Sequence, residues 1–330
     1  MQRFTFLRKM NMPLLILMVN IFIALLGVGL AIPVLPKFIL DLGATGKDQG
    51  YLVAATGLTQ FLFSPFGGKL SDKYGRKIIT IAGLGIIMLS QLMFSFSSDL
   101  WLLYLSRLIG GIGIGILVPA NMAYVADVTT IENRGKGMGL LGAAISLGFV
   151  IGPGLGGFLA EFGIRVPFFA SAFAAGIAMV VSFLFLPETL SKEQQYAARN
   201  SKQEKDGMVH DILRSYKVSY FVLLLLVLTM TFGLANFEAI YGLYVSEKYD
   251  YTPKDISIIL TVGALVGVII QAVLVDWLLR RFDEIKVINT CFILSAVSMV
   301  FVLLSGNFLY MLIMNVFFFL FTSILRPAIN

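Results

Sequence analysis

Charged residues are scarce in this chain. Only 13% of its 330 residues are Asp, Glu, Lys or Arg, whereas an average soluble domain has about 25%. With 58% hydrophobic residues and a mean hydropathy of +0.88, the chain has too few polar side chains to coat a water-soluble fold. The composition excludes a soluble globular domain and predicts an all-α, polytopic membrane protein.

Cysteine and histidine are almost absent. The single cysteine, Cys291, excludes an internal disulfide and a cysteine metal site, and the single histidine, His210, argues against zinc binding and histidine-based catalysis. No nucleophile–base pair is visible, so we expect neither an enzyme nor a metal or cofactor. We also expect no cleavable signal peptide, because the first apolar run, 12–34, is too long and lacks a small-residue cleavage site.

Ten apolar runs are long enough to cross a bilayer, which takes about twenty residues. The expected helices are 13–36, 50–69, 78–96, 101–126, 138–160, 167–187, 219–244, 256–279, 287–304 and 308–326. A polar stretch, 188–217, is interpreted as a cytoplasmic linker. It divides an N-terminal half of six helices, 1–187, from an incomplete C-terminal half of four helices, 218–330.

The net charge of +6 does not indicate nucleic-acid binding, because the basic residues are spread between apolar runs instead of forming one patch. Eighteen of the 25 Lys and Arg residues lie in the N-terminus and in the loops after the second, fourth, sixth and eighth helices, and five lie in the other loops. The positive-inside rule therefore predicts a cytoplasmic N-terminus, and ten helices return the C-terminus to the same side.

The two parts also resemble one another. Gly46-Lys47-Asp48 opens the second expected helix, and Pro253-Lys254-Asp255 opens the eighth, about 207 residues later. Each of these helices ends in a short basic loop. This weak repeat predicts two halves related by an axis along the membrane normal, a plan that is typical of transporters.

A glycine-rich run lies in the middle of the fifth expected helix. Gly148, Gly152 and Gly156 are four residues apart and leave one helix face without side chains, while Pro153 removes a helix hydrogen bond. Gly157 follows Gly156 directly in the sequence. Such a face favours very close helix packing, and we expect its partner to be the Gly263–Gly267 face of the second half, so that the run forms part of a pivot between the halves.

A second strong signal is the loop 68–77, Gly-Lys-Leu-Ser-Asp-Lys-Tyr-Gly-Arg-Lys. Gly75 permits a left-handed turn between two helices, and Asp72 is placed to interact with Arg76 or with a helix N-terminus. A basic cytoplasmic loop explains the lysines, but it does not explain Gly68, Gly75 and the aspartate at this spacing.

In these segments the chain resembles the major facilitator superfamily. The loop 68–77 matches its signature between helices two and three, 148–157 matches its antiporter motif, and 105–111 matches its helix-four arginine motif. Segments 27–36 and 232–238 resemble drug:proton antiporters, the multidrug and fluoroquinolone efflux pumps of the NorA/Bmr type. The resemblance implies a monomeric pump in the bacterial cell membrane, in contact with lipid, which exports lipophilic or cationic drugs and is powered by the proton gradient without a cofactor.

Glu238 and Arg107 are charged residues that lie more than one turn inside expected membrane helices. A carboxylate such as Glu238 is costly in an apolar segment and is usually functional, and the desolvated acid can bind and release a proton. Its neighbours Phe237, Tyr241 and Tyr244 offer aromatic surface for a flat cation. The resemblance adds proton and substrate coupling to Glu238 and proton coupling to Arg107. The alternatives are a solvated Glu238 in a water-filled vestibule and a snorkelling Arg107.

The resemblance assigns three further roles. Asp127 would join Asp72 and Arg76 in a cytoplasmic charge relay that stabilises the outward-facing state, although a solvated aspartate at a helix end is an almost equal alternative. Gln60 and Phe149 would face a central cavity and contact substrate, while Phe149 fits a lipid-facing position equally well.

Two departures from the family pattern leave the function open. Family members have two halves of six helices, whereas this sequence ends at Asn330 with four helices in its second half. Ser323 stands where related pumps carry a second carboxylate. Proton-coupled drug efflux is therefore weighed against a truncated fragment that does not transport, and against a facilitator for another small solute.

Overall fold

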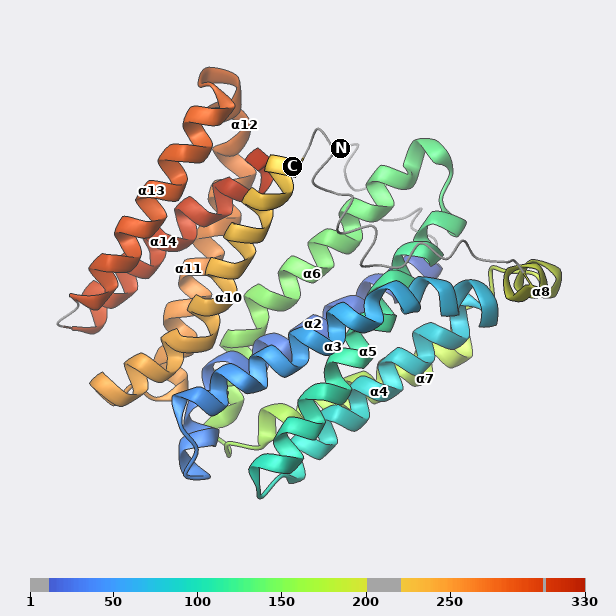
Figure 1. Ribbon diagram of the computed structural model, residues 1–330, viewed down its shortest axis with the longest axis horizontal. Coiled ribbons are helices and arrows are strands. Elements are labelled where there is room, and N and C mark those ends of the chain that lie inside the picture. Colours follow the sequence, from blue (N-terminus) through green and yellow to red (C-terminus); the bar gives the residue numbers. More distant parts are fainter. Residues whose placement is uncertain (1–11, 201–220, 305–306, 330) are drawn as a thin grey trace. The chain divides into compact units, whose positions relative to one another are not determined.

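The structure is a computed structural model that describes residues 12–200, 221–304 and 307–329 (Figure 1). These residues form helices joined by short turns, and no strand occurs in these ranges. The chain divides into two compact units, Met1–Glu204 and Lys205–Asn330. The predicted all-α class is confirmed.

The first unit contains α2 (Met12–Asp41), α3 (Gly46–Tyr74), α4 (Arg76–Phe96), α5 (Leu100–Val128), α6 (Ile131–Ala160), α7 (Val166–Phe185) and α8 (Lys192–Asn200). Within it, α2 packs against α6 and α7, and α5 packs against α3 and α4 (Figure 1). Its core includes Leu17, Leu84 and Leu117, which are fully buried. Helices that are distant in sequence are therefore neighbours in this unit.

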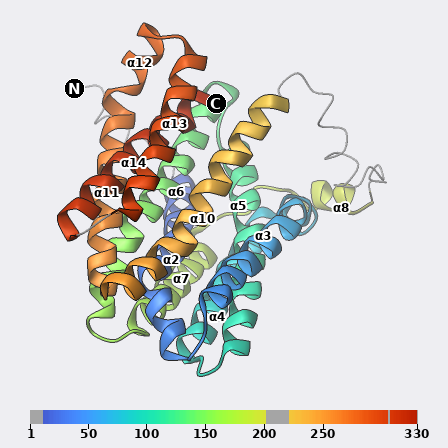
Figure 2. The ribbon, with the colours of Figure 1, turned by 60° about the vertical axis from the view of Figure 1, so that its left-hand side comes forward.

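The second unit contains α10 (Phe221–Tyr249), α11 (Pro253–Val273), α12 (Val275–Arg281), α13 (Glu284–Leu303) and α14 (Phe308–Ile329). Helix α14 contacts α10, α11 and α13, and Figure 2 shows it beside α11 and α13. The predicted helix 256–279 is divided in the structure into α11 and α12, with Leu274 between them at φ −102° and ψ −27°.

The prediction of ten membrane-spanning helices is not confirmed. Nine helices of the described ranges are long and apolar enough to cross a membrane. The 29-residue helix α3 does not reach the same hydropathy, because Thr, Gln, Ser, Gly and Pro interrupt its apolar residues. It nevertheless packs against α5 along the first unit.

Capping explains the short sequence repeat. At the start of α3, the Asp48 carboxylate accepts hydrogen bonds from the backbone N–H of Thr45 and from its hydroxyl, both at 2.8 Å. At the start of α11, Asp255 accepts the corresponding bonds from Thr252 at 3.0 and 2.7 Å. Both are capping boxes, in which a side chain three residues into the helix satisfies the N-cap residue. The repeat therefore marks two equivalent helix starts.

Candidate functional site

The loop between α3 and α4 is a single residue, Gly75. Its φ of +105° is a backbone conformation that side-chain-bearing residues rarely adopt. A Cβ at this position would also collide with the carboxylate of Glu188. The predicted turn at Gly75 therefore has two physical causes, its backbone conformation and the close approach of an acidic side chain.

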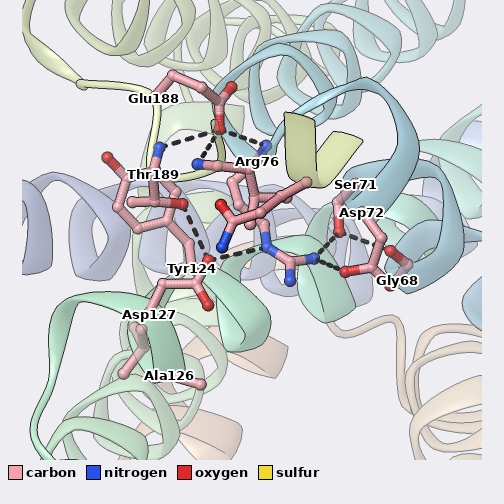
Figure 3. A network of polar contacts seen from close by, with 12 residues as sticks. Gly68, Ser71, Asp72, Arg76, Tyr124, Ala126, Asp127, Glu188 and Thr189 are labelled. Carbon is pink, nitrogen blue, oxygen red and sulfur yellow. Dashed lines mark hydrogen bonds and ion pairs between the residues drawn. The ribbon is translucent and has the colours of Figure 1, made fainter. Parts of the chain in front are cut away.

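Arg76 is the centre of a polar network at this turn (Figure 3). Its side chain is only 9% exposed, and its Nη1 lies 2.6 Å from Asp72 Oδ1. The same nitrogen donates to the Ser71 hydroxyl at 2.6 Å, while Nε donates to Asp127 Oδ2 at 3.0 Å. The planar guanidinium thus joins the end of α3 to the end of α5, as a fork with donors on two sides can do. The structure brings together all three residues of the predicted relay.

Glu188 belongs to this site, although the sequence pattern places it in the predicted linker 188–217 and does not identify it as a site residue. Its carboxylate accepts hydrogen bonds from the backbone N–H groups of Arg76 at 2.9 Å and Lys77 at 3.2 Å. These are the first two residues of α4, so Glu188 caps a helix from 112 residues away. The only sequence signal was an acidic residue directly after the last apolar run of the first half.

Residues next to Glu188 also form hydrogen bonds with α5, at the residues Tyr124 and Asp127. The hydroxyl of Thr189 donates to Asp127 Oδ2 at 2.9 Å, and the hydroxyl of Tyr124 donates to the carbonyl of Pro187 (Figure 3). Farther along, Arg199 of α8 donates from Nε to the carbonyl of Lys73 at 2.8 Å, and its guanidinium lies over the Tyr74 ring. Part of the predicted linker 188–217 therefore packs on the first unit, and residues 201–217 lie outside the described ranges.

Gly68 is not required by a close contact with another helix. A Cβ there would meet nothing within 4 Å, whereas a Cβ on Gly67 would lie 2.7 Å from Ile116 Cα. Gly67 is thus the glycine of α3 that α5 approaches closely. The carbonyl of Gly68 accepts a hydrogen bond from the Ser71 hydroxyl at 2.7 Å, which links it to the network through Ser71.

The glycine face of α6 is occupied by α2. A Cβ on Gly148 would lie 2.9 Å from the backbone nitrogen of Leu26, and one on Gly152 would lie 2.7 Å from Gly29 Cα. Gly156 meets α2 in the same way, and Pro153 and Gly157 are buried beside it. The run does permit close packing, but the expected partner is wrong. Gly263 and Gly267 face Phe319 and Ser323 of α14 within the second unit.

This contact yields a stability prediction. We expect Gly152→Val to lower the apparent melting temperature of the purified protein, because the new side chain would overlap the backbone at Gly29. Overpacking of this kind costs roughly 1–3 kcal/mol. Gly142→Val is the matched control, since Gly142 lies on the same helix with nothing within 4 Å of its Cβ position. Equal melting temperatures for the two variants would refute the close contact between α6 and α2.

Arg107 lies inside the first unit on α5. Its guanidinium is 4.4 Å from the centroid of the Phe94 ring, and its Nη2 is buried without a hydrogen-bond partner among the described residues. Phe94 itself contacts Phe38 and Phe168. The charge is therefore stabilised by an aromatic face, and no carboxylate of the described residues pairs with it. The proton-coupling role of Arg107 stays a prediction.

Glu238 lies on α10 of the second unit and is half-buried. In the described part of the chain, no hydrogen bond or ion pair links its carboxyl group to another residue. A membrane-embedded acid without a fixed partner is able to exchange a proton or meet a cation. The structure gives Glu238 this setting, and its coupling role stays a prediction.

The aromatic neighbours of Glu238 pack inward. Phe237 stacks on Tyr241 at 4.8 Å between centroids and contacts Phe318 at 4.5 Å. The hydroxyl of Tyr241 accepts a hydrogen bond from Asn315 Nδ2 at 2.9 Å. In this conformation both predicted binding residues contribute to the contact between α10 and α14. Their role in substrate binding stays a prediction.

The remaining predicted site residues are not brought together. Gln60 is exposed on α3, and Phe149 is half-buried and packs on the core of the first unit. Ser323 donates a hydrogen bond to the carbonyl of Leu320 at 2.8 Å and is thus engaged within α14. Among the described residues, no group of three or more His, Cys, Asp or Glu side chains is placed to hold a metal ion.

Comparison with known proteins covers nearly the whole chain. A family model described as Major Facilitator Superfamily matches residues 17–330. Multidrug resistance protein 2 of Bacillus subtilis (strain 168) is 42% identical over 316 residues, which are 96% of this chain and 79% of that protein. Quinolone resistance protein NorA of Staphylococcus aureus (strain COL) is 34% identical over 322 residues, 97% of this chain and 81% of that protein.

Solved structures support the same fold. A bacterial homologue of the human lysosomal transporter Spinster, in an inward-facing and unoccupied conformation, has a TM-score of 0.75. It is 15% identical in sequence, and the match covers 96% of this chain and 73% of that chain. At this identity the likeness shows how the helices are arranged and carries no information about substrate.

Proposed function

The chain belongs to the major facilitator superfamily, and we propose that it exports lipophilic, often cationic drugs from bacterial cells in exchange for protons. It is a multi-pass membrane transporter and not an enzyme. The proposed drug substrates are supported by its identity of 34–42% to multidrug and quinolone resistance proteins along nearly its whole length.

The observation that carries the proton-coupled part of the proposal is the setting of Glu238. This carboxyl group lies on a membrane-spanning helix and has no fixed partner in the described ranges. A negatively charged Glu238 attracts a cationic drug, and a protonated Glu238 does not. One site can therefore bind drug and proton alternately, which is the minimum that an exchanger requires.

The proposed cycle is alternating access. The drug enters from the cytoplasm or the inner leaflet while Glu238 is deprotonated. A proton from outside then displaces the drug, and release of that proton inside resets the pump. Each 100 mV of membrane potential contributes about 2.3 kcal/mol per charge moved. The network around Arg76 joins α3, α4 and α5 at one end of the first unit, where it stabilises one of the two states.

The proposed orientation places this network at the cytoplasmic face. Arg76, Asp127 and Glu188 lie at or directly beside the loops that follow α3, α5 and α7, and hydrogen bonds and an ion pair join them. The three loops therefore lie on one side of the unit. Because basic residues accumulate in these loops, that side is proposed to be cytoplasmic, with both chain termini on it.

A transport assay in everted membrane vesicles tests the proposal. Vesicles that contain the protein are loaded with a pH gradient, acid inside, and the accumulation of the fluorescent cation ethidium is followed. We expect uptake that requires the gradient and stops when a protonophore is added. Transport of ethidium only down its own gradient would instead indicate a facilitator, and vesicles indistinguishable from empty ones would contradict transport by this chain.

A further inference from the structure

Glu188 is held by more hydrogen bonds than any other acidic side chain described around the Arg76 network. Besides the amides of Arg76 and Lys77, its carboxylate accepts from its own neighbours Thr189 at 3.0 Å and Leu190 at 3.3 Å. Four backbone N–H groups thus converge on one carboxylate. Such convergence fixes both the side chain and the segment that carries it.

Charge balance explains why a third carboxylate is tolerated here. Asp72 and Asp127 pair with the Arg76 guanidinium, and no ion pair links Glu188 to a Lys or Arg side chain of the described residues. Its counter-charge is the N-terminus of the 21-residue helix α4, which carries about half a positive charge. Gly75 leaves the space that the carboxylate needs, because a Cβ there would occupy its position.

The segment 187–190, which we call the strap, touches both partners of the central ion pair. Glu188 binds the backbone N–H of Arg76, and Thr189 binds the carboxylate of Asp127. Tyr124, one turn before Asp127 on α5, binds the carbonyl of Pro187. Displacement of the strap would therefore loosen α4 and α5 at the same time.

The strap also lies on the covalent path between the two units. After it, the chain forms α8, which is attached to the end of α3 through Arg199 and the carbonyl of Lys73. The second unit begins at Lys205, shortly after α8 ends. Along the covalent chain, α8 and the strap are the described parts of the first unit that lie nearest to the second unit.

We propose that Glu188 is a positioning residue of the transport cycle. When the strap is seated, Glu188 caps α4 and aligns Arg76 with Asp127; when the strap leaves, the cap and the ion pair are released together. The start of the linker would thereby stabilise the polar network around Arg76, besides joining the two units of the chain. This proposal rests on the proposed transport function for its role in the cycle, but the cap itself is independent of transport.

Hydrogen–deuterium exchange of the purified full-length protein tests the cap. In Glu188→Ala, the amides of Arg76 and Lys77 lose their acceptor, and we expect them to exchange about tenfold faster than in the wild type. Glu188→Gln retains one acceptor oxygen but no charge, so its exchange should be intermediate. Glu193→Gln, on the exposed side of α8, is the matched control. Unchanged exchange in Glu188→Ala would overturn the proposal, and peptides from α2 verify that each variant is folded.

Ethidium efflux from the same variants tests the role in the cycle. Because Glu188 is proposed to position the network and not to touch the drug, Glu188→Gln should reduce the maximal rate and leave the KM for ethidium unchanged, while Glu188→Asp should restore part of the rate. Faster exchange with a wild-type maximal rate, or a raised KM alone, would overturn the positioning role. A wild-type protein without efflux would contradict the proposed function, while the exchange data would still decide the cap.

Discussion

Replacement of Glu238 by glutamine is expected to reduce proton-driven drug export to the level of vesicles that lack the protein. Glutamine has almost the same size and can still form hydrogen bonds, but it cannot release a proton. The variant is therefore unable to alternate between a charged and a neutral state. Because the Glu238 carboxyl group forms no hydrogen bond or ion pair among the described residues, the substitution should leave folding unaffected.

The measurement is the accumulation of ethidium in everted vesicles at several imposed pH gradients. The wild-type rate should rise with the gradient, and the Glu238→Gln rate should not respond to it. Glu247→Gln is the matched control, because Glu247 is an exposed acid on the same helix, near its end. Gradient-dependent uptake by Glu238→Gln would show that the coupling carboxylate lies elsewhere.

Replacement of Arg76 by lysine is expected to have the second-largest effect, although it conserves the charge. The guanidinium contacts Asp72 and Asp127 with different nitrogens, and a single ammonium group cannot reproduce both contacts in their present directions. A hydrogen bond to a charged group contributes about 1.5–3 kcal/mol when it is buried. The side chains of Asp72 and Asp127 are 49% and 27% exposed, so the lower end of that range applies here.

A loss near this lower end corresponds to roughly a tenfold change in the balance between transport states. The maximal rate of ethidium efflux should therefore fall about tenfold in Arg76→Lys. Lys69→Arg provides the control, because Lys69 is an exposed basic residue on α3 outside the network. If Arg76→Lys transports at the wild-type rate, the simultaneous contacts of the guanidinium with Asp72 and Asp127 are not needed for transport, and the proposed role of Arg76 is wrong.

The glycines of α6 show which part of a helix contact can be predicted from the sequence. Spacing alone identified a face of α6 that accepts a very close neighbour, because the absence of a side chain is visible in the sequence. It did not identify the neighbour, since any small or backbone surface satisfies the same condition. The structure places Gly29 of α2 there, and it places Phe319 against the face that had been expected.

The polar residues around Arg76 likewise show that a sequence pattern predicts contacts between near neighbours but not between residues that are distant in the chain. Asp72 and Arg76 are four residues apart across one turn, so their ion pair follows from local geometry. Glu188 and Arg76 are 112 residues apart, and their hydrogen bond exists only because α4 begins on the side of the unit where α5 and α7 end. No local pattern could distinguish Glu188 from the other acidic residues of the polar stretch.

Composition, hydropathy and the motif around Gly75 were sufficient to predict an all-α membrane protein and the turn at Gly75, whereas helix starts were missed by up to seven residues, as at α6, which begins at Ile131 and not at 138. These properties depend on solvent transfer and on contacts within about one helical turn, so they can be read from neighbouring residues. The partner of the glycine face, the capping of α4 by Glu188, and the inward packing of Phe237 and Tyr241 against α14 depend on which helices meet. Many side chains are chemically suited to each of these contacts, and only the packed tertiary structure selects one.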